Sequence, residues 1–85
     1  MFQAKTKTFS GRVKRVVHVA TINEVNLMLY GVLLSGEPEW LRICTTEIKN
    51  AEKIAFLSPN AHVEIRVRGD IAVRGTTYME FHSLS

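Results

Sequence analysis

The chain has 85 residues, of which 46% are hydrophobic and 22% charged, a composition that fits one small globular domain and excludes a disordered chain. A single cysteine excludes an internal disulfide, and the longest apolar segment, VNLMLYGVLL, is too short to span a bilayer, which takes about 20 residues. The N-terminal MFQAKTKTFSG lacks the apolar run of a signal peptide. We expect one cytoplasmic domain over residues 1–85, with residues 1–9 as a flexible basic segment and no membrane partner.

The formal net charge is +3, and the basic residues are clustered. The first cluster contains no acidic residue and holds Lys5, Lys7, Arg12, Lys14 and Arg15, while the second holds Arg66, Arg68 and Arg74. Clustered positive charge indicates a polyanionic partner, with nucleic acid first and an anionic membrane surface second. On charge alone, an ordinary solvated basic surface is an equal alternative.

The first strand is expected over Ser10 to Ala20. Alternation predicts one face with Val13, Val17 and Val19, and an opposite face with Arg12, Lys14, Val16 and His18. Arg15 interrupts this alternation, which indicates a bulge that bends the strand.

The second strand is expected over Val25 to Ser35, after a loop at residues 21–24. Both of its faces are apolar: one holds Val25, Leu27, Leu29 and Leu33, and the other Met28, Tyr30, Val32 and Leu34. A strand that is apolar on both faces is covered on both. Because the chain is small, we expect the second cover to be another copy, in a homodimer or higher homo-oligomer.

The third strand follows the turn SGEPE and contains Trp40. Leu41 and Ile43 share one face, as ordinary core residues do, while Trp40, Arg42 and Cys44 take the other. A large aromatic side chain that faces water needs a partner. This face is therefore the first candidate for a binding surface.

A helix is expected over Glu47 to Leu57, with Thr45 or Thr46 as its cap. Its apolar stripe is predicted to hold Ile48, Ala51 and Ala55. A fourth strand begins near Val63, bends at Gly69 and continues over residues 71–73, with Val63, Ile65 and Val67 inward and His62, Glu64, Arg66 and Arg68 outward. After a tight turn at residues 74–76, a last strand covers Thr77 to Ser83, and alternation leaves open whether Tyr78 or its neighbours face the core.

Three strands, a short helix and two strands make the order of the OB-fold, so we predict an all-β, five-stranded barrel with its helix between the third and fourth strands. OB-folds bind oligonucleotides or oligosaccharides on the face of strands 2 and 3. Trp40 and Arg42 are predicted to lie on that face.

With this order, the chain resembles the bacterial and phage single-stranded DNA-binding protein family. The similar residues are Trp40-x-Arg42-Ile43, Ile65-x-Val67-x-Gly69-x-Ile71 and Thr77-Tyr78-Met79-Glu80-Phe81, within a resemblance that covers roughly residues 10–84. It implies a homo-oligomer that binds single strands without sequence preference, with Trp40 stacking on a base and Arg42 contacting an adjacent phosphate or base. The loops between strands 1 and 2 and between strands 4 and 5 are shorter than is usual for the family, which implies a smaller grip.

The remaining candidates come from strand geometry. Phosphate contacts are predicted for Arg12, Lys14, Arg66, Arg68 and Arg74, with a solvated strand face as the alternative. Tyr30 and Tyr78 are candidate stacking residues, although a tyrosine in a two-sided strand is more often packed. For Trp40 itself, the alternative is a dimer interface.

No motif for catalysis, a cofactor or a metal is present, and the three histidines, His18, His62 and His82, fall on three separate strands. Cys44 lacks a nucleophile signature and is expected to be a small buried or interface residue. We predict a non-enzymatic, sequence-tolerant single-stranded DNA-binding protein that acts in replication, recombination or transfer of DNA, with proteins of those processes as further partners. The choice between DNA and RNA stays open. The alternative is an OB-fold protein-interaction subunit that does not bind DNA strongly.

Overall fold

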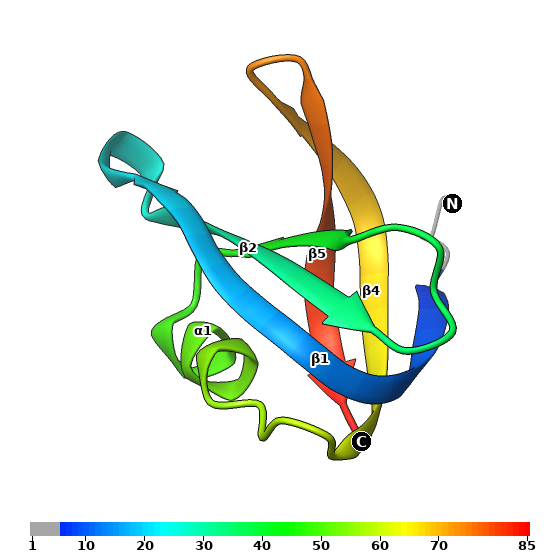
Figure 1. Ribbon diagram of the computed structural model, residues 1–85. Coiled ribbons are helices and arrows are strands. Elements are labelled where there is room, and N and C mark those ends of the chain that lie inside the picture. The colour runs from blue at the N-terminus through cyan, green and yellow to red at the C-terminus, as the bar shows by residue number, and fades with distance from the viewer. Residues whose placement is uncertain (1–5) are drawn as a thin grey trace.

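The computed structural model describes residues 6–85, which fold into a closed barrel of five strands and one α-helix (Figure 1). In chain order the elements are β1 (Thr6–Ile22), a 3-10 helix (Asn23–Val25), β2 (Leu27–Leu34), β3 (Leu41–Thr45), α1 (Ile48–Ala55), β4 (His62–Val73) and β5 (Thr76–Leu84). The strands are arranged in the order β1-β2-β3-β5-β4, and β4 pairs with β1 to close the ring. The predicted OB-fold, with its helix between β3 and β4, is confirmed.

The long strand β1 closes the barrel because it pairs with two neighbours. Its first half pairs with β4, from Thr6 opposite Arg68 to Arg12 opposite His62, and its second half pairs with β2. Residues 6–9 are therefore part of the sheet, and the expectation of a flexible segment over residues 1–9 is wrong for these four. The rest of that segment, including Lys5, lies outside the described residues.

The predicted bulge in β1 is present and changes which residues face the core. The pairing with β2 is irregular between Val13 and Arg15, and again between His18 and Ala20. Val13 is buried in the core, but beyond the first irregularity it is Val16 that packs against the core. Because an extra residue reverses the alternation, the prediction that Val13 and Val17 share a face is wrong.

Strand β2 is covered on both faces by its own chain. Tyr30, Val32 and Leu34 belong to the main core inside the barrel. On the other face, Leu27 and Leu29 form a second cluster with Cys44 and Tyr78, against which four partly buried residues pack: Ala20, Ile22, Ile71 and Val73. At Leu27 and Leu29 the cover of the outer face is therefore provided within the chain, mainly by the β4–β5 hairpin, and a second copy is not needed there.

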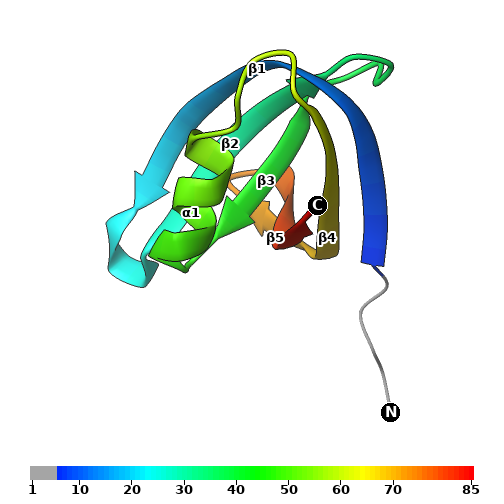
Figure 2. The ribbon, with the colours of Figure 1, turned by 90° about the horizontal axis from the view of Figure 1, so that it is seen from below.

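Helix α1 packs against the barrel through Ala51 and Ile54 and contacts β1, β3 and β5 (Figure 2). The predicted stripe is correct only at Ala51, because Ile48 is 72% exposed and Ala55 is also exposed. The Glu47 backbone N–H donates to Thr45 Oγ1 at 3.1 Å just before the helix, but the N-cap residue is Glu47 and no side chain caps the helix, so the prediction that Thr45 or Thr46 is the cap is wrong. No helix of residues 6–85 is long and apolar enough to cross a membrane.

Strands β4 and β5 form a hairpin whose tip extends past β2 and β3 (Figure 1). Its pairing shifts between Val67 and Asp70, at the predicted bend, where Gly69 has a φ of 73° that favours glycine. The turn is Arg74-Gly75, and beyond the shift Tyr78 lies opposite Ile71. The hairpin thus brings Tyr78 over the outer face of β2 and β3, where it joins the second cluster.

Candidate nucleic-acid interface

A cleft of about 310 Å³ lies between the sheet of β1, β2 and β3 and the start of β5. Its lining comes from four strands and the loop before β3: Val17, Val19, Gly31, Trp40, Arg42, Thr76 and Tyr78. Three of the residues predicted from the sequence as nucleic-acid contacts, Trp40, Arg42 and Tyr78, are therefore brought together in one place. We call this hollow the cleft.

The register between β2 and β3 determines which side chains reach the cleft. Gly31 lies opposite Arg42, and Tyr30 lies opposite Ile43. Since paired residues share a face and successive residues alternate, Gly31 and Arg42 face outward while Tyr30 and Ile43 face the core. Trp40 immediately precedes β3 and is 38% exposed, as a side chain that lies across a surface would be.

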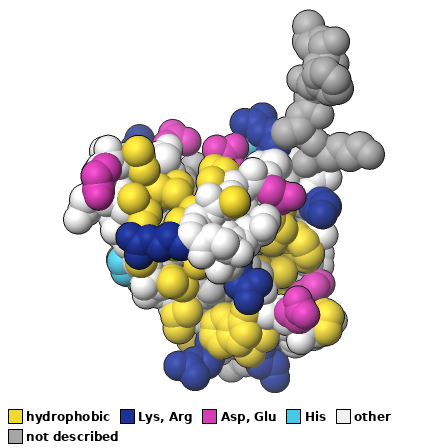
Figure 3. Space-filling model, turned by 90° about the horizontal axis from the view of Figure 1, so that it is seen from above, with side chains coloured by type: hydrophobic (Ala, Val, Ile, Leu, Met, Phe, Trp, Pro, Cys, Tyr) yellow, Lys and Arg dark blue, Asp and Glu magenta, His cyan; other side chains and the backbone are white. Residues whose placement is uncertain are grey.

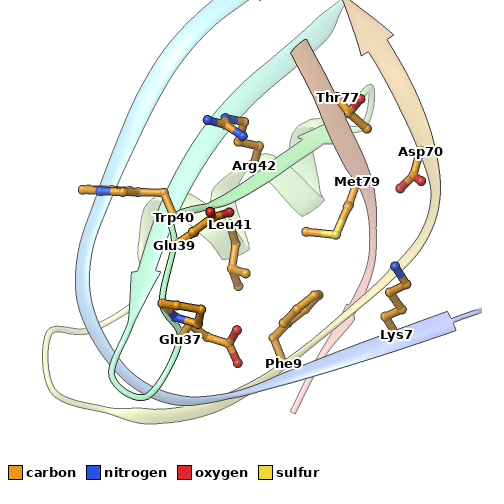
Figure 4. A pocket seen from close by; sticks show the side chains of 11 residues that line it. Lys7, Phe9, Glu37, Glu39, Trp40, Leu41, Arg42, Asp70, Thr77 and Met79 are labelled. Atoms are coloured by element: carbon orange, nitrogen blue, oxygen red, sulfur yellow. The ribbon is translucent and has the colours of Figure 1, made fainter.

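A second hollow, of about 350 Å³, opens inside the ring of strands (Figure 4). Phe9, Leu41 and Met79 point into it, and its other lining residues are Lys7, Glu37, Pro38, Glu39, Trp40, Arg42, Asp70 and Thr77. We call this hollow the mouth. Trp40 and Arg42 line both the mouth and the cleft, so they form a ridge between the two.

The two sides of the ridge differ in charge. The mouth contains three carboxylates, from Glu37, Glu39 and Asp70, against Lys7 and the shared Arg42. The cleft contains no acidic side chain among its lining residues. The surface view from above shows hydrophobic side chains interspersed with Lys and Arg, and Asp and Glu nearer the margins (Figure 3). A polyanion is therefore better accommodated on the cleft side.

The two predicted tyrosines occupy different environments. Tyr78 is 6% exposed: it walls the cleft while packing on Leu27, Leu29 and Cys44. Tyr30 is 7% exposed and belongs to the barrel core, where its ring centroid lies 5.2 Å from that of His18. Tyr30 thus faces away from the cleft, in the packed environment that is usual for a tyrosine in a two-sided strand.

The other predicted basic residues line neither hollow. Arg66 and Arg68 are exposed on the wall formed by β1 and β4, opposite Thr8 and Thr6. Arg12 lies further along this wall, where its Nη1 donates to the Asn60 carbonyl at 3.2 Å. Lys14 is exposed at the irregularity in β1, and Arg74 is exposed at the tip of the β4–β5 hairpin, two residues from the cleft residue Thr76.

Sequence reasoning missed four cleft residues: Val17, Val19, Gly31 and Thr76. Val17 and Val19 were predicted to share the face of Val13, which lies in the core, but the two irregularities in β1 leave them on the cleft side. It also missed Arg15, which lies opposite Leu33 and so shares the outward face of Val17 and Gly31. One available signal was Gly31 itself, because a glycine within a strand often marks a close approach of another group.

Cys44 is buried with no measurable exposure, as expected for a small buried residue. Burial, and to a smaller extent the negative charge of Glu80, raises the pKa of the Cys44 thiol to about 11. His18, His62 and His82 are exposed on β1, β4 and β5. Within residues 6–85 no group of three or more His, Cys, Asp or Glu side chains is placed to hold a metal ion.

No protein-family model matches the sequence, and no curated protein matches it. Two crystal structures of the mitochondrial single-stranded DNA-binding protein Rim1 from S. cerevisiae are similar to this chain. One has a TM-score of 0.63 at 11% identity, covering 96% of this chain and 94% of that chain. The other, a selenomethionine form, has a TM-score of 0.58 at 14% identity, covering 99% and 94%. At these identities the likeness supports a shared OB-fold, and bacterial or phage kinship stays a prediction.

Proposed function

We propose that this protein binds single-stranded DNA without sequence preference and serves replication, recombination or transfer of DNA. The observation that carries the proposal is the ridge: an exposed tryptophan beside an arginine, on the outer face of β2 and β3 of an OB-fold. The fold is shared with a solved protein that is itself a single-stranded DNA-binding protein.

The chemistry of the ridge suits a single strand. Every base has a π-face, so stacking on Trp40 would contribute about 1–3 kcal/mol per base without selecting a sequence. The guanidinium of Arg42 can pair with a phosphate or stack on a base. A paired duplex exposes its phosphates but not its base faces, because duplex bases are already stacked on one another. Stacking on Trp40 therefore favours a single strand.

The charge difference across the ridge orients the strand in this proposal. Carboxylates of Glu37, Glu39 and Asp70 would repel phosphates from the mouth. On the other side, Arg15 shares the cleft face and Arg74 stands at the hairpin tip. The sugar-phosphate backbone would therefore follow the cleft side, with a base turned toward Trp40.

A fluorescence titration tests the proposal directly, because Trp40 is the only tryptophan. Mixed-sequence DNA oligonucleotides should quench its emission through stacking, and binding should weaken when salt is raised, since each phosphate contact releases condensed counterions. The same titration with an RNA oligonucleotide compares the two polymers. Unchanged emission at low salt, together with no binding of a labelled oligonucleotide, would overturn the proposal.

The alternative function, a protein-interaction subunit, loses one of its two supports. It rested on the apolar strand β2 and on Trp40, and the inner face of β2 and the Leu27–Leu29 part of its outer face are covered within the chain. If Trp40 nevertheless docks on a protein, Trp40→Ala should abolish that assembly and leave DNA affinity unchanged. The DNA-binding proposal expects the opposite result.

A further inference from the structure

Gly31 lies directly against the indole of Trp40. A Cβ atom placed on Gly31 would come within 3.2 Å of Trp40 Cε3 and 3.7 Å of Trp40 Cζ3. It would also come within 3.1 Å of Val17 Cγ2, on the neighbouring strand. Gly31 and its cross-strand neighbour Arg42 are on the outer face of the sheet, yet Gly31 is buried, which is consistent with the indole of Trp40 covering it.

The backbone conformation does not explain a glycine at this position. Gly69 and Gly75 have φ values of 73° and 82°, a region that other residues rarely adopt, whereas Gly31 lies within the regular pairing of β2 with β1 and β3. A glycine in the middle of a strand is destabilising by roughly 0.5–1 kcal/mol relative to alanine. The absence of a side chain is explained by the space that the Trp40 indole and the Val17 side chain occupy on either side of Gly31.

We propose that Gly31 is a positioning residue, which acts by seating the Trp40 indole against the sheet at the ridge. The inference rests on the proposed function, since it assigns to Gly31 the orientation of the base-stacking side chain. Gly31 itself would touch no nucleotide, because the indole covers it. Its effect on DNA binding would pass entirely through Trp40.

The contacts on either side of Gly31 indicate how a methyl group would act. A Cβ atom on Gly31 would lie 3.1 Å from Val17 Cγ2 and 3.2 Å from Trp40 Cε3, so close that one of these neighbours has to shift by a few tenths of an ångström. Val17 belongs to a paired strand and is held by the sheet, whereas Trp40 precedes β3 and is partly exposed. The indole is thus the group that is free to give way, and it would move outward from the sheet.

The free protein provides the first test. In Gly31→Ala, the emission of Trp40 should shift to longer wavelength and acrylamide should quench it faster, because the displaced indole meets more water. Adding Gly31→Ala to Val17→Ala should lower the melting temperature by less than adding it to the unmodified protein, because the 3.1 Å contact with Val17 Cγ2 is gone. The Trp40 emission should be shifted in both cases. Emission and quenching equal to those of the unmodified protein would overturn the inference, whatever happens to DNA binding.

A double-mutant cycle on a labelled oligonucleotide provides the second test. Gly31→Ala should weaken binding. The upper limit is the effect of losing the stacking contribution of Trp40 completely, about 5- to 150-fold. In a Trp40→Ala background, Gly31→Ala should change affinity by less than about twofold, because the group through which it acts is gone. Fully additive effects would overturn the inference. If Trp40→Ala leaves affinity unchanged, the proposed stacking role of Trp40 fails, and the emission shift of free Gly31→Ala still decides whether Gly31 positions the indole.

Discussion

At the scale of single residues, Arg42 is the basic side chain that both hollows share. We expect Arg42→Gln to weaken binding mainly at low salt and to reduce the slope of log affinity against log salt by about 0.7, the value for one phosphate contact on a single strand. The measurement is a set of oligonucleotide titrations at four salt concentrations. Lys53→Gln, which removes one exposed charge from α1, is the matched control and should leave the slope unchanged. Equal changes in both variants would contradict a phosphate contact at Arg42.

Cys44 gives a second residue-scale prediction, for alkaline pH. Its pKa is raised from 9.0 to about 11 in the folded protein, so between these values the unfolded chain loses the thiol proton while the folded chain keeps it. The contribution to the free energy of unfolding is constant below pH 9 and falls as pH rises toward 11, by at most about 1.4 kcal/mol per pH unit.

Chemical denaturation of the protein and of Cys44→Ala at pH 8 and pH 10.5 checks this sign. The unmodified protein should lose more stability over this interval than the variant, because only it carries the thiol. Alkylation of the native thiol at pH 8 should also be slower than that of the unfolded chain, since the thiolate is the reactive form. Equal pH dependence in the two proteins, with fast native alkylation, would show that the thiol is not buried.

At the scale of elements, the β4–β5 hairpin depends on Tyr78 for its position over β2 and β3. Tyr78→Ala should lower the free energy of unfolding by about 3 kcal/mol, in the range of large core truncations, because it empties the centre of the second cluster. Tyr78→Phe should keep most of the stability and most of the DNA affinity, since Tyr78 serves as a packed wall of the cleft. Urea denaturation and oligonucleotide titration of both variants test this. A large loss of affinity in stable Tyr78→Phe would instead assign a direct contact to the hydroxyl.

The elements also show where sequence patterns reach their limit. The alternation of Leu41 and Ile43 predicted the core face of β3 correctly, because a short regular strand keeps its period. In β1 the period changes at the irregularity between Val13 and Arg15, so the faces of Val17 and Val19 could not be read from spacing. On α1 the pattern selected Ile48, but the short helix buries Ala51 and Ile54 because its position on the barrel fixes which side is covered.

At the scale of the whole molecule, the order of strands and helix was predictable because turn residues separate each apolar run. The pairing across the ring was not, since which strands become neighbours depends on contacts distant in sequence. Trp40 and Arg42 could be predicted to face outward, because Leu41 and Ile43, which alternate with them along the chain, face the core. Gly31 and Val17 could not, because their place beneath and beside the indole depends on the register of three strands.

Self-association is a whole-molecule prediction that no longer rests on β2. A chain of 85 residues has a small core, and association is a common way for such chains to gain stability. We expect a dimer or larger assembly at micromolar concentration, measured by sedimentation velocity, with a radius of gyration in solution clearly above the 12.3 Å of the single chain. A single monomeric boundary at all concentrations would contradict this expectation and leave the cleft intact as a monomer site.

The central claim is that one exposed aromatic side chain at the ridge binds a base of a single strand, and Trp40→Ala tests it most directly. Its control is Phe56→Ala, which removes another exposed aromatic, 77% accessible beside α1 and part of neither hollow. Fluorescence anisotropy of a labelled DNA oligonucleotide should show affinity reduced about 5- to 150-fold in Trp40→Ala and unchanged in Phe56→Ala. Equal affinity in folded Trp40→Ala and the unmodified protein would contradict the account.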